Sequence, residues 1–88
     1  MAGVPEARIK ALVESLTPMY HHFEGTTTTV CALFLPNGYQ VAIGMSACVV
    51  PADFNAEMGR KYSLLDAVKK AETKLWELEG YCLKKAID

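Results

Sequence analysis

An Asn37-Gly38 dipeptide separates two runs of β-branched and large apolar residues, and no other signal in the chain limits its fold so strongly. The runs are Thr26–Leu35 and Tyr39–Val50. Asn-Gly between two such runs is a strong hairpin signal, because both residues tolerate the positive φ of a type I′ turn. We therefore predict an antiparallel β-hairpin closed by a type I′ turn.

The return strand carries different residues on its two faces. Its even positions are small or polar, and its odd positions are mostly large and apolar: Tyr39, Val41, Ile43, Met45, Ala47 and Val49. Successive side chains of a strand point to opposite faces. The pattern predicts that the odd face packs a core and that the flat even face allows a close approach.

Helices are predicted on both sides of the hairpin. Apolar residues at helical spacing favour a short amphipathic helix over Pro5–Thr17, ended by Pro18. Met19, Tyr20 and Phe23 continue the apolar face and allow a further turn. A long helix is expected from Ala56 to Glu79.

The end of the chain is predicted from a glycine. Gly80 should end the long helix, since glycine is common just after a helix C-terminus. Tyr81–Leu83 would then pack back onto the core, and Lys84–Asp88 should fray.

The long helix has two apolar stripes. Leu64, Val68, Ala71, Leu75 and Leu78 form the first, and Met58, Tyr62, Leu65 and Trp76 form the second. A helix that is apolar on two faces is buried on both. Either a second copy of the chain or the N-terminal helix covers the second stripe, and we favour assembly through it.

Composition agrees with assembly. The 88 residues are 51% apolar, or about 58% with glycine included, against about 45–50% in average domains. A chain of this size cannot bury so much apolar surface alone. We expect one α+β domain over residues 1–88, with an N-terminal helix, an antiparallel β-hairpin and a long C-terminal helix, assembled as a homo-oligomer.

Several functional classes are disfavoured. The net charge of −1 argues against a partner such as DNA or RNA, which favours basic proteins. No apolar run is long enough for a membrane span, and the N-terminus lacks a signal-peptide pattern, so a cytoplasmic protein is expected.

Metal, cofactor and catalytic patterns are also missing. Cys31, Cys48 and Cys82 are too widely spaced for a zinc site and are expected to be buried small hydrophobes, and the adjacent His21 and His22 usually point apart. No phosphate loop, dinucleotide fingerprint or nucleophile elbow occurs. We predict a protein with no enzymatic activity, metal or cofactor.

Small-anion binding is the better-founded hypothesis. Asp53 and Asn55 precede the long helix, where either side chain can cap it and where free N–H groups favour anions. Arg60, Lys70 and Lys74 lie within about a quarter-turn of one another on that helix. The alternative is a solvated face on which the lysines pair with neighbouring carboxylates.

Four ordered motifs resemble a known family of proteins. They are Asn37-Gly38-Tyr39, Ser46-Ala47-Cys48, Pro51-Ala52-Asp53-Phe54-Asn55 and Trp76-Glu77-Leu78-Glu79-Gly80-Tyr81. The chain resembles small tailed-phage proteins from about Ile9 to Leu83. Within them it is similar to the group that contains the first-described Thoeris anti-defence proteins.

The resemblance implies a function. Those phage proteins act as sponges that bind cyclic ADP-ribose isomers made by TIR enzymes and keep them from the effector, in the host bacterial cytoplasm. Some members are hexamers that also sequester cyclic oligonucleotides of the CBASS system. The alternative is a structural or regulatory phage oligomer that binds no small ligand.

The family's nucleotide pocket lies between subunits, and its residues can be placed by motif. The hairpin aromatic corresponds to Tyr39, and the turn residues Asn and Asp fall on Asp53 and Asn55, interchanged. The basic residue of the last helix falls near Lys70, where members that bind the signal have Arg. The resemblance therefore implies a ligand site of Tyr39, Asp53, Asn55, Arg60, Lys70 and Lys74, with a weaker phosphate contact at Lys70.

Overall fold

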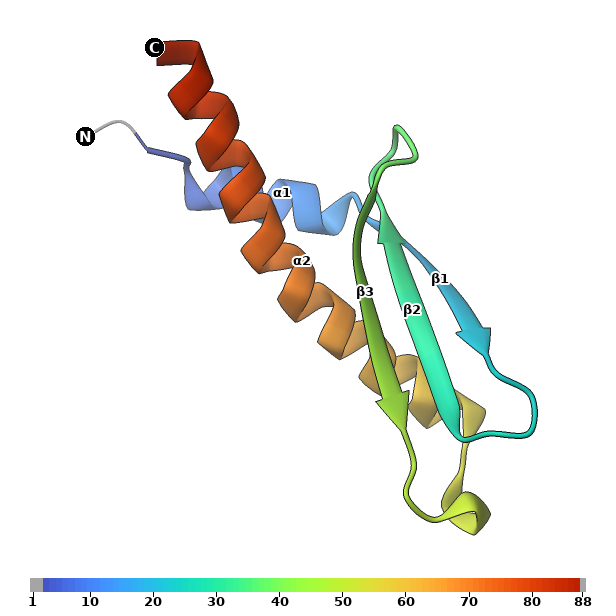
Figure 1. Cartoon of the computed structure of the whole chain (residues 1–88). Coiled ribbons are helices and arrows are strands. Elements are labelled where there is room, and N and C mark those ends of the chain that lie inside the picture. The colour runs from blue at the N-terminus through green and yellow to red at the C-terminus, as the bar shows by residue number, and fades with distance from the viewer. Residues whose placement is uncertain (1–2, 88) are drawn as a thin grey trace.

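Two strands form the predicted hairpin. β2 (Thr28–Phe34) and β3 (Gln40–Ala47) are antiparallel in the computed structural model of the chain, which describes residues 3–87 (Figure 1). The turn type differs from the prediction, because only Gly38 has a positive φ, at 88°. The Gly38 amide donates to the Leu35 carbonyl over 2.8 Å, and Asn37 Oδ1 accepts from the Tyr39 amide over 2.9 Å. This is a three-residue loop with glycine in the left-handed region, another common hairpin connection.

A third strand replaces the end of the predicted first helix. α1 spans Glu6–Glu14, and β1 (Thr17–His22) pairs antiparallel with β2, from Thr17 opposite Phe34 to His22 opposite Thr29. The sheet order is β1-β2-β3. The further helical turn through Met19 and Tyr20 was therefore a wrong prediction. Pro18 disfavours helical geometry before it, and pairing with β2 then satisfies the extended backbone.

The long helix runs further than predicted. α2 spans Ala56–Ile87, after a short 3-10 turn, η1 (Pro51–Asp53). Gly80 is helical, so the predicted helix end at this residue was wrong. Tyr81 is exposed rather than packed onto the core, and Lys84–Ile87 are helical rather than frayed, while Asp88 lies outside the described residues. The last turns of α2 project beyond the sheet (Figure 1).

Helix α2 packs on the flat face of the sheet, and the predicted orientation of β3 was wrong. Ala42 and Gly44 are buried against α2, whereas Ile43 and Met45 are about half exposed. A bulge at the start of β3 reverses the alternation, because Phe34 pairs with Gln40 while Leu33 pairs with Ala42. From Ile43 onward the large odd side chains therefore point away from the helix, whereas Val41, at the bulge, is buried in the core.

Contact between α2 and β3 is close because the residues between them are small. A Cβ atom added to Gly44 would lie 2.2 Å from the Ala67 nitrogen and 2.5 Å from the Ser63 carbonyl oxygen. Ser63 is fully buried at this contact. Its hydroxyl donates to the Arg60 carbonyl over 3.1 Å.

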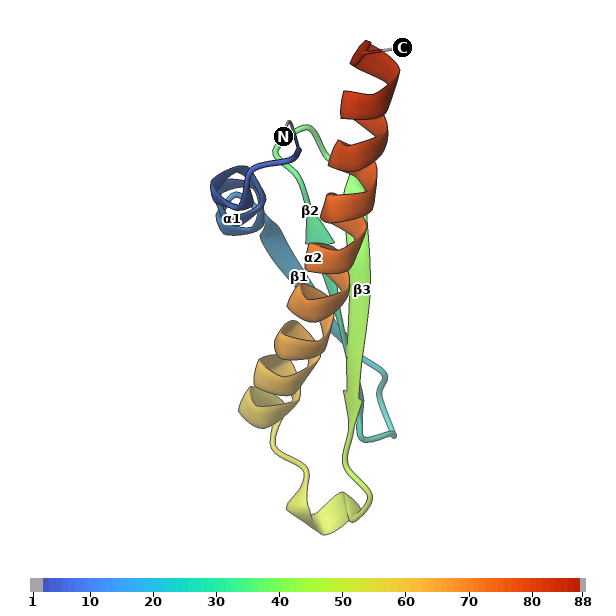
Figure 2. The same cartoon turned by 90° about the vertical axis from the view of Figure 1, so that its left-hand side faces the viewer.

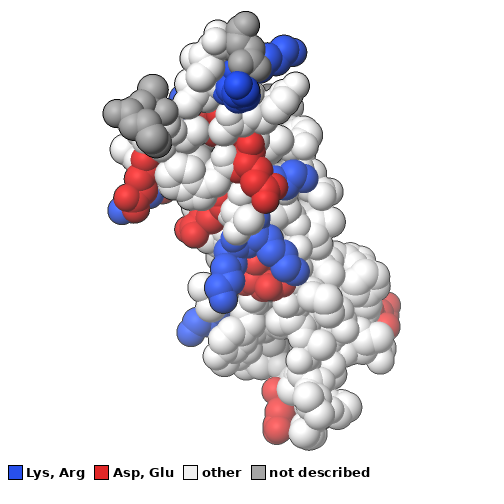
Figure 3. Space-filling model, turned by 60° about the vertical axis from the view of Figure 1, so that its left-hand side comes forward, with Lys and Arg blue, Asp and Glu red and all other residues white. Residues whose placement is uncertain are grey.

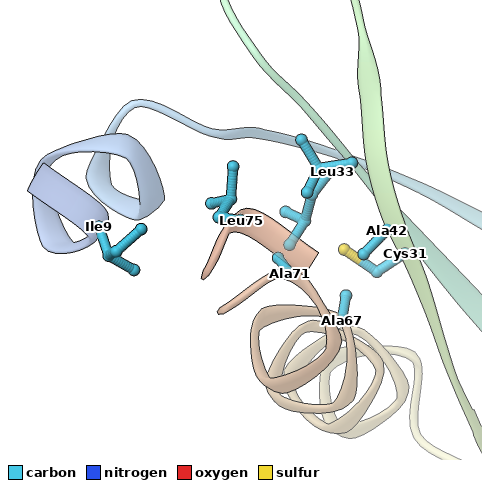
Figure 4. Close-up of a cluster of buried hydrophobic side chains, with 8 residues drawn as sticks. Ile9, Cys31, Leu33, Ala42, Ala67, Ala71 and Leu75 are labelled. Carbon is cyan, nitrogen blue, oxygen red and sulfur yellow. The ribbon is translucent and has the colours of Figure 1, made fainter. Parts of the chain in front are cut away.

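The core lies between α1, α2 and the inner face of the sheet (Figures 2 and 4). Its buried apolar residues are few, and half of them are Ala or Cys: Ile9, Cys31, Leu33, Val41, Ala42, Ala67, Ala71 and Leu75. The molecule measures 54 × 23 × 18 Å, and its radius of gyration of 15.7 Å exceeds the roughly 12 Å of a compact chain of this length. A single copy of the chain therefore buries little of its apolar surface.

Candidate functional site

A pocket of about 290 Å³ lies where the end of β3 meets the start of α2. The chain reverses direction here through η1, so strand end, turn and first helical turns come together at the lower end of the molecule in Figure 1. The pocket is lined mainly by apolar atoms with a few polar groups, from Thr27, Ser46, Ala47, Cys48, Asp53, Phe54, Asn55, Met58, Gly59 and Tyr62. We call this the turn pocket.

Two predicted ligand residues line the turn pocket. Asn55 caps α2, as one of the two predicted alternatives: its Oδ1 accepts from the amides of Glu57 over 2.9 Å and Met58 over 3.3 Å. The cap occupies part of the helix N-terminus that was expected to face an anion. Asp53 ends η1 and is exposed, so its carboxylate is available to a ligand.

Most of the pocket wall was not predicted as a ligand site. Met58 and Tyr62 belong to the apolar stripe expected to mediate assembly, and they are 43% and 48% exposed. Ser46 and Cys48 belong to the Ser-Ala-Cys motif, which was the one sequence signal for them. The Cys48 thiol contacts the Val50 carbonyl over 3.1 Å, which ties the end of β3 to the turn.

An aromatic contact holds the turn against the sheet. The His22 ring stacks on Phe54 with ring centroids 4.7 Å apart, and His22 Nε2 lies 2.6 Å from the Thr26 carbonyl oxygen. The β1–β2 loop and the turn before α2 are thereby joined. This contact gives Phe54 a fixed position in the pocket wall.

A second, shallow groove lies along the middle of α2. It measures about 360 Å³ and is lined by Asp66, Lys69, Lys70, Thr73, Lys74 and Glu77. The Lys70 ammonium pairs with Asp66 over 2.9 Å, and Lys74 Nζ lies 5.8 Å from the centroid of the Tyr39 ring. The structure thus brings together three predicted site residues, Tyr39, Lys70 and Lys74, in a cluster that we call the lysine groove.

Asp66 connects this groove to the sheet and was not predicted as a site residue. Its carboxylate accepts from the Met45 amide of edge strand β3 over 3.0 Å and from Lys70. The hydrogen bonds from Met45 and then Lys70 lower the pKa of Asp66 below its ordinary value of 3.8. A carboxylate that is charged at neutral pH therefore fixes the position of Lys70.

The turn pocket and the lysine groove are separate within one protomer. Lys70 lies about 22 Å beyond Asn55 along the helix axis, at about 1.5 Å per residue. Arg60 is exposed and lies near Tyr20 of β1. Burial raises the pKa of Tyr20, and the positive charge of Arg60 partly offsets this rise. The six predicted residues do not form one site in a single copy.

Cysteine environments differ along the chain. Cys31 is buried, as expected, and burial raises the pKa of its thiol, partly offset by a hydrogen bond with Tyr20. Cys82 is exposed, so the prediction of a buried residue was wrong there. Within residues 3–87 no three His, Cys, Asp or Glu side chains are grouped so that they could hold a metal ion.

Charge is distributed unevenly over the surface. Basic and acidic side chains alternate over the upper part of the molecule in Figure 3, while the lower part, which includes the turn before α2, is mostly uncharged. Neither helix of the described segment combines the length and the apolar content needed to cross a membrane. The cations near the lysine groove are thus interleaved with carboxylates.

Residues 4–87 match the model of a family described as Phage protein (N4 Gp49/phage Sf6 gene 66) family. No curated protein and no solved structure gives a significant match.

Proposed function

The chain belongs to the N4 Gp49/phage Sf6 gene 66 family of phage proteins, and from this membership we propose that it is an anti-defence sponge that captures a cyclic nucleotide signal without catalysis. The proposed ligands are cyclic ADP-ribose isomers made by Thoeris TIR enzymes, with CBASS cyclic oligonucleotides as a second class. The proposal extends the likeness of four sequence motifs to the Thoeris anti-defence proteins.

One observation carries the proposal: the turn pocket is built from two of those motifs. Ser46 and Cys48 come from the Ser-Ala-Cys motif, and Asp53 and Asn55 come from the turn motif. Small-molecule sites are concave and mostly apolar, with a few placed polar groups, and the turn pocket fits this description. The Asp53 carboxylate and the Ser46 hydroxyl suit ribose hydroxyls, and the exposed Tyr62 ring suits a base.

Phosphates would be held by another copy of the chain. The Asn55 side chain already uses two amides at the start of α2, and Lys70 and Lys74 lie too far away within one protomer. The turn pocket is also at the lower end of the volumes that small-molecule sites have, about 300–1,000 Å³. Assembly through the second stripe of α2, which holds Met58 and Tyr62 of the pocket wall, would bring a second copy to the site.

Ligand depletion tests this function. Purified protein is mixed with a TIR-generated cyclic ADP-ribose isomer, protein is removed by ultrafiltration, and free ligand is measured by chromatography before and after heating. A parallel mixture contains a CBASS cyclic oligonucleotide. We expect depletion of at least one signal and recovery of the intact molecule on heating, because sequestration depends on slow release rather than on chemistry.

Matched variants locate the site. Asp53→Ala and Lys70→Met should each weaken capture about tenfold or more, since a hydrogen bond to a charged group contributes about 1.5–3 kcal/mol. Lys85→Ala, near the far end of α2, removes one positive charge and should leave capture unchanged. Recovery of an altered ligand would contradict the absence of catalysis, and depletion of neither signal would refute the sponge hypothesis.

A further inference from the structure

The side of the sheet opposite α2 is an apolar surface. Directly paired residues of antiparallel strands share a face. Val30 is opposite Met45, and Ala32 is opposite both Met19 and Ile43. Together with Phe34 of the central strand, these side chains form a surface that spans all three strands, which we call the outer face.

This outer face has no cover within one protomer. Met19, Ile43 and Met45 are 62%, 47% and 52% exposed, although they sit in the middle of regular strands. Both helices lie on the other side of the sheet (Figures 1 and 2). Among residues 3–87, no helix or strand packs over the outer face.

The strands carry no formal charge. Between Thr17 and Ala52 the sole Asp, Glu, Lys or Arg is Glu24, which lies in the loop between β1 and β2. Soluble monomers rarely expose large contiguous apolar patches. Depletion of charged residues is typical of the cores of protein–protein interfaces.

The solvent-accessible surface area of one chain indicates how much surface a partner could still bury. The protomer exposes 6245 Å², whereas a monomeric protein of this mass exposes about 5,100 Å². The excess of about 1,100 Å² is of the size that one partner contributes to a stable interface, about 800 Å². The excess belongs to the whole molecule, including the projecting end of α2, and it is large enough to include one such interface.

We propose that the outer face packs against the outer face of a second copy of this chain about a two-fold axis. A two-fold axis places a face against its own image, so a charged face would meet like charges. Apart from His21, which is opposite Val30 and shares this face, the outer face holds no ionisable side chain. It therefore meets little such repulsion and offers little complementary charge to a charged partner. This interface is distinct from the second stripe of α2, which lies on the opposite side of the molecule.

Charge variants at Ile43 test the arrangement. By size-exclusion chromatography with light scattering at micromolar concentration, the wild type should have at least twice the mass of one chain. Ile43→Lys and Ile43→Glu should each lower that mass by a factor of two or more. Both signs of charge should act alike, because the introduced group would lose its water against the apolar outer face of the other copy.

The control is Ile87→Lys, an equally apolar exposed residue at the end of α2, which should leave the mass unchanged. Circular dichroism checks folding, and Met19→Lys with Met19→Glu replaces the pair if Ile43 variants unfold. A monomeric wild type, or an unchanged mass in both lysine variants, would overturn the proposal. A lower mass with only one sign of charge would also overturn it, because the outer face would then bind a charged surface. Ligand capture is measured separately, so failure here leaves the sponge hypothesis standing.

Discussion

Single small residues determine how α2 sits on the sheet. Gly44 faces the backbone of Ser63 and Ala67, and Gly59 faces the side chain of Thr29. Backbone atoms of a helix cannot move aside as the end of a flexible side chain can. The position of α2, and with it that of Asp66 beside Met45, therefore depends on the absence of a Cβ atom at residue 44.

Gly44→Ala should strongly destabilise the fold. The added Cβ would lie 2.2 Å from the Ala67 nitrogen, so α2 or β3 must shift, at a cost of about 3 kcal/mol or more. Urea unfolding measures the change. Gly80→Ala is the control: apart from the neighbouring backbone of its own helix, no atom would lie within 4 Å of the added Cβ, and removing a helix glycine should stabilise by about 0.5–1 kcal/mol. Equal effects of the two variants would refute the close contact.

Asp66 should contribute a pH-dependent part of stability. Its pKa is lowered on folding, so the charged carboxylate stabilises the folded state above its ordinary value of 3.8, and this contribution is lost as pH falls through the folded pKa. Asp66→Asn should make the free energy of unfolding less pH-dependent below pH 3.8. Glu72→Gln, on an exposed part of the same helix, is the control. An unchanged acid profile for Asp66→Asn would contradict the assignment.

At the scale of helices and strands, the sequence correctly predicted those features that a few adjacent residues determine. The hairpin at Asn37-Gly38 and the cap at Asn55 are confirmed, because each depends on a few adjacent residues. β1 was missed because its strand conformation depends on pairing with β2, and the apolar residues Met19, Tyr20 and Phe23 also fit a helical spacing. The end of α2 was predicted too early. Glycine often ends a helix by adopting a left-handed conformation, but Gly80 keeps helical geometry and α2 continues to Ile87.

In the candidate site, too, the sequence predicted the contacts between adjacent residues but not those between distant ones. The turn residues Asp53 and Asn55 lie together as expected, since they are neighbours in sequence. Lys70 and Lys74 share a helix face but lie several turns away, because angular position on a helix says nothing of distance along it. Tyr62 could be assigned to the pocket only after the turn before α2 was seen to fold back.

Asn55→Ala should destabilise α2 from its first turn. Two amides lose their acceptor, which typically costs about 1 kcal/mol. Asn55→Asp keeps the oxygen and should unfold at nearly the wild-type urea concentration. The contrary result, equal loss in both variants, would mean that Asn55 acts through its amide nitrogen rather than as a cap.

At the scale of the molecule, apolar residues lie exposed on two opposite sides. One side is the outer face of the sheet, and the other is the second stripe of α2, where Tyr62 and Leu65 are 48% and 56% exposed. α1 reaches this stripe at Trp76, which lines a hollow with Ile9 and Val13. The N-terminal helix thus leaves most of the stripe uncovered, contrary to the less favoured prediction.

Leu65→Lys tests assembly through α2. If the stripe is an interface, a lysine at its centre should lower the mass of the assembly and weaken ligand capture together, because the proposed site is shared between copies. Light scattering and the depletion assay measure the two effects. Val49→Lys, at a position that is 96% exposed, is the matched control. Full capture by a dissociated Leu65→Lys protein would contradict a shared site.

The projection of α2 beyond the sheet has a consequence for local unfolding. Its buried residues end at Leu75, while the helix continues to Ile87. Unwinding from the C-terminus can therefore pass several turns before any core residue is exposed to water, opposed near Glu79 by the ion pair with Arg8. Amide hydrogens should exchange quickly in these last turns and slowly from Ser63 to Leu75. We therefore expect the projecting end of α2 to open at a lower free-energy cost than the helix–sheet contact.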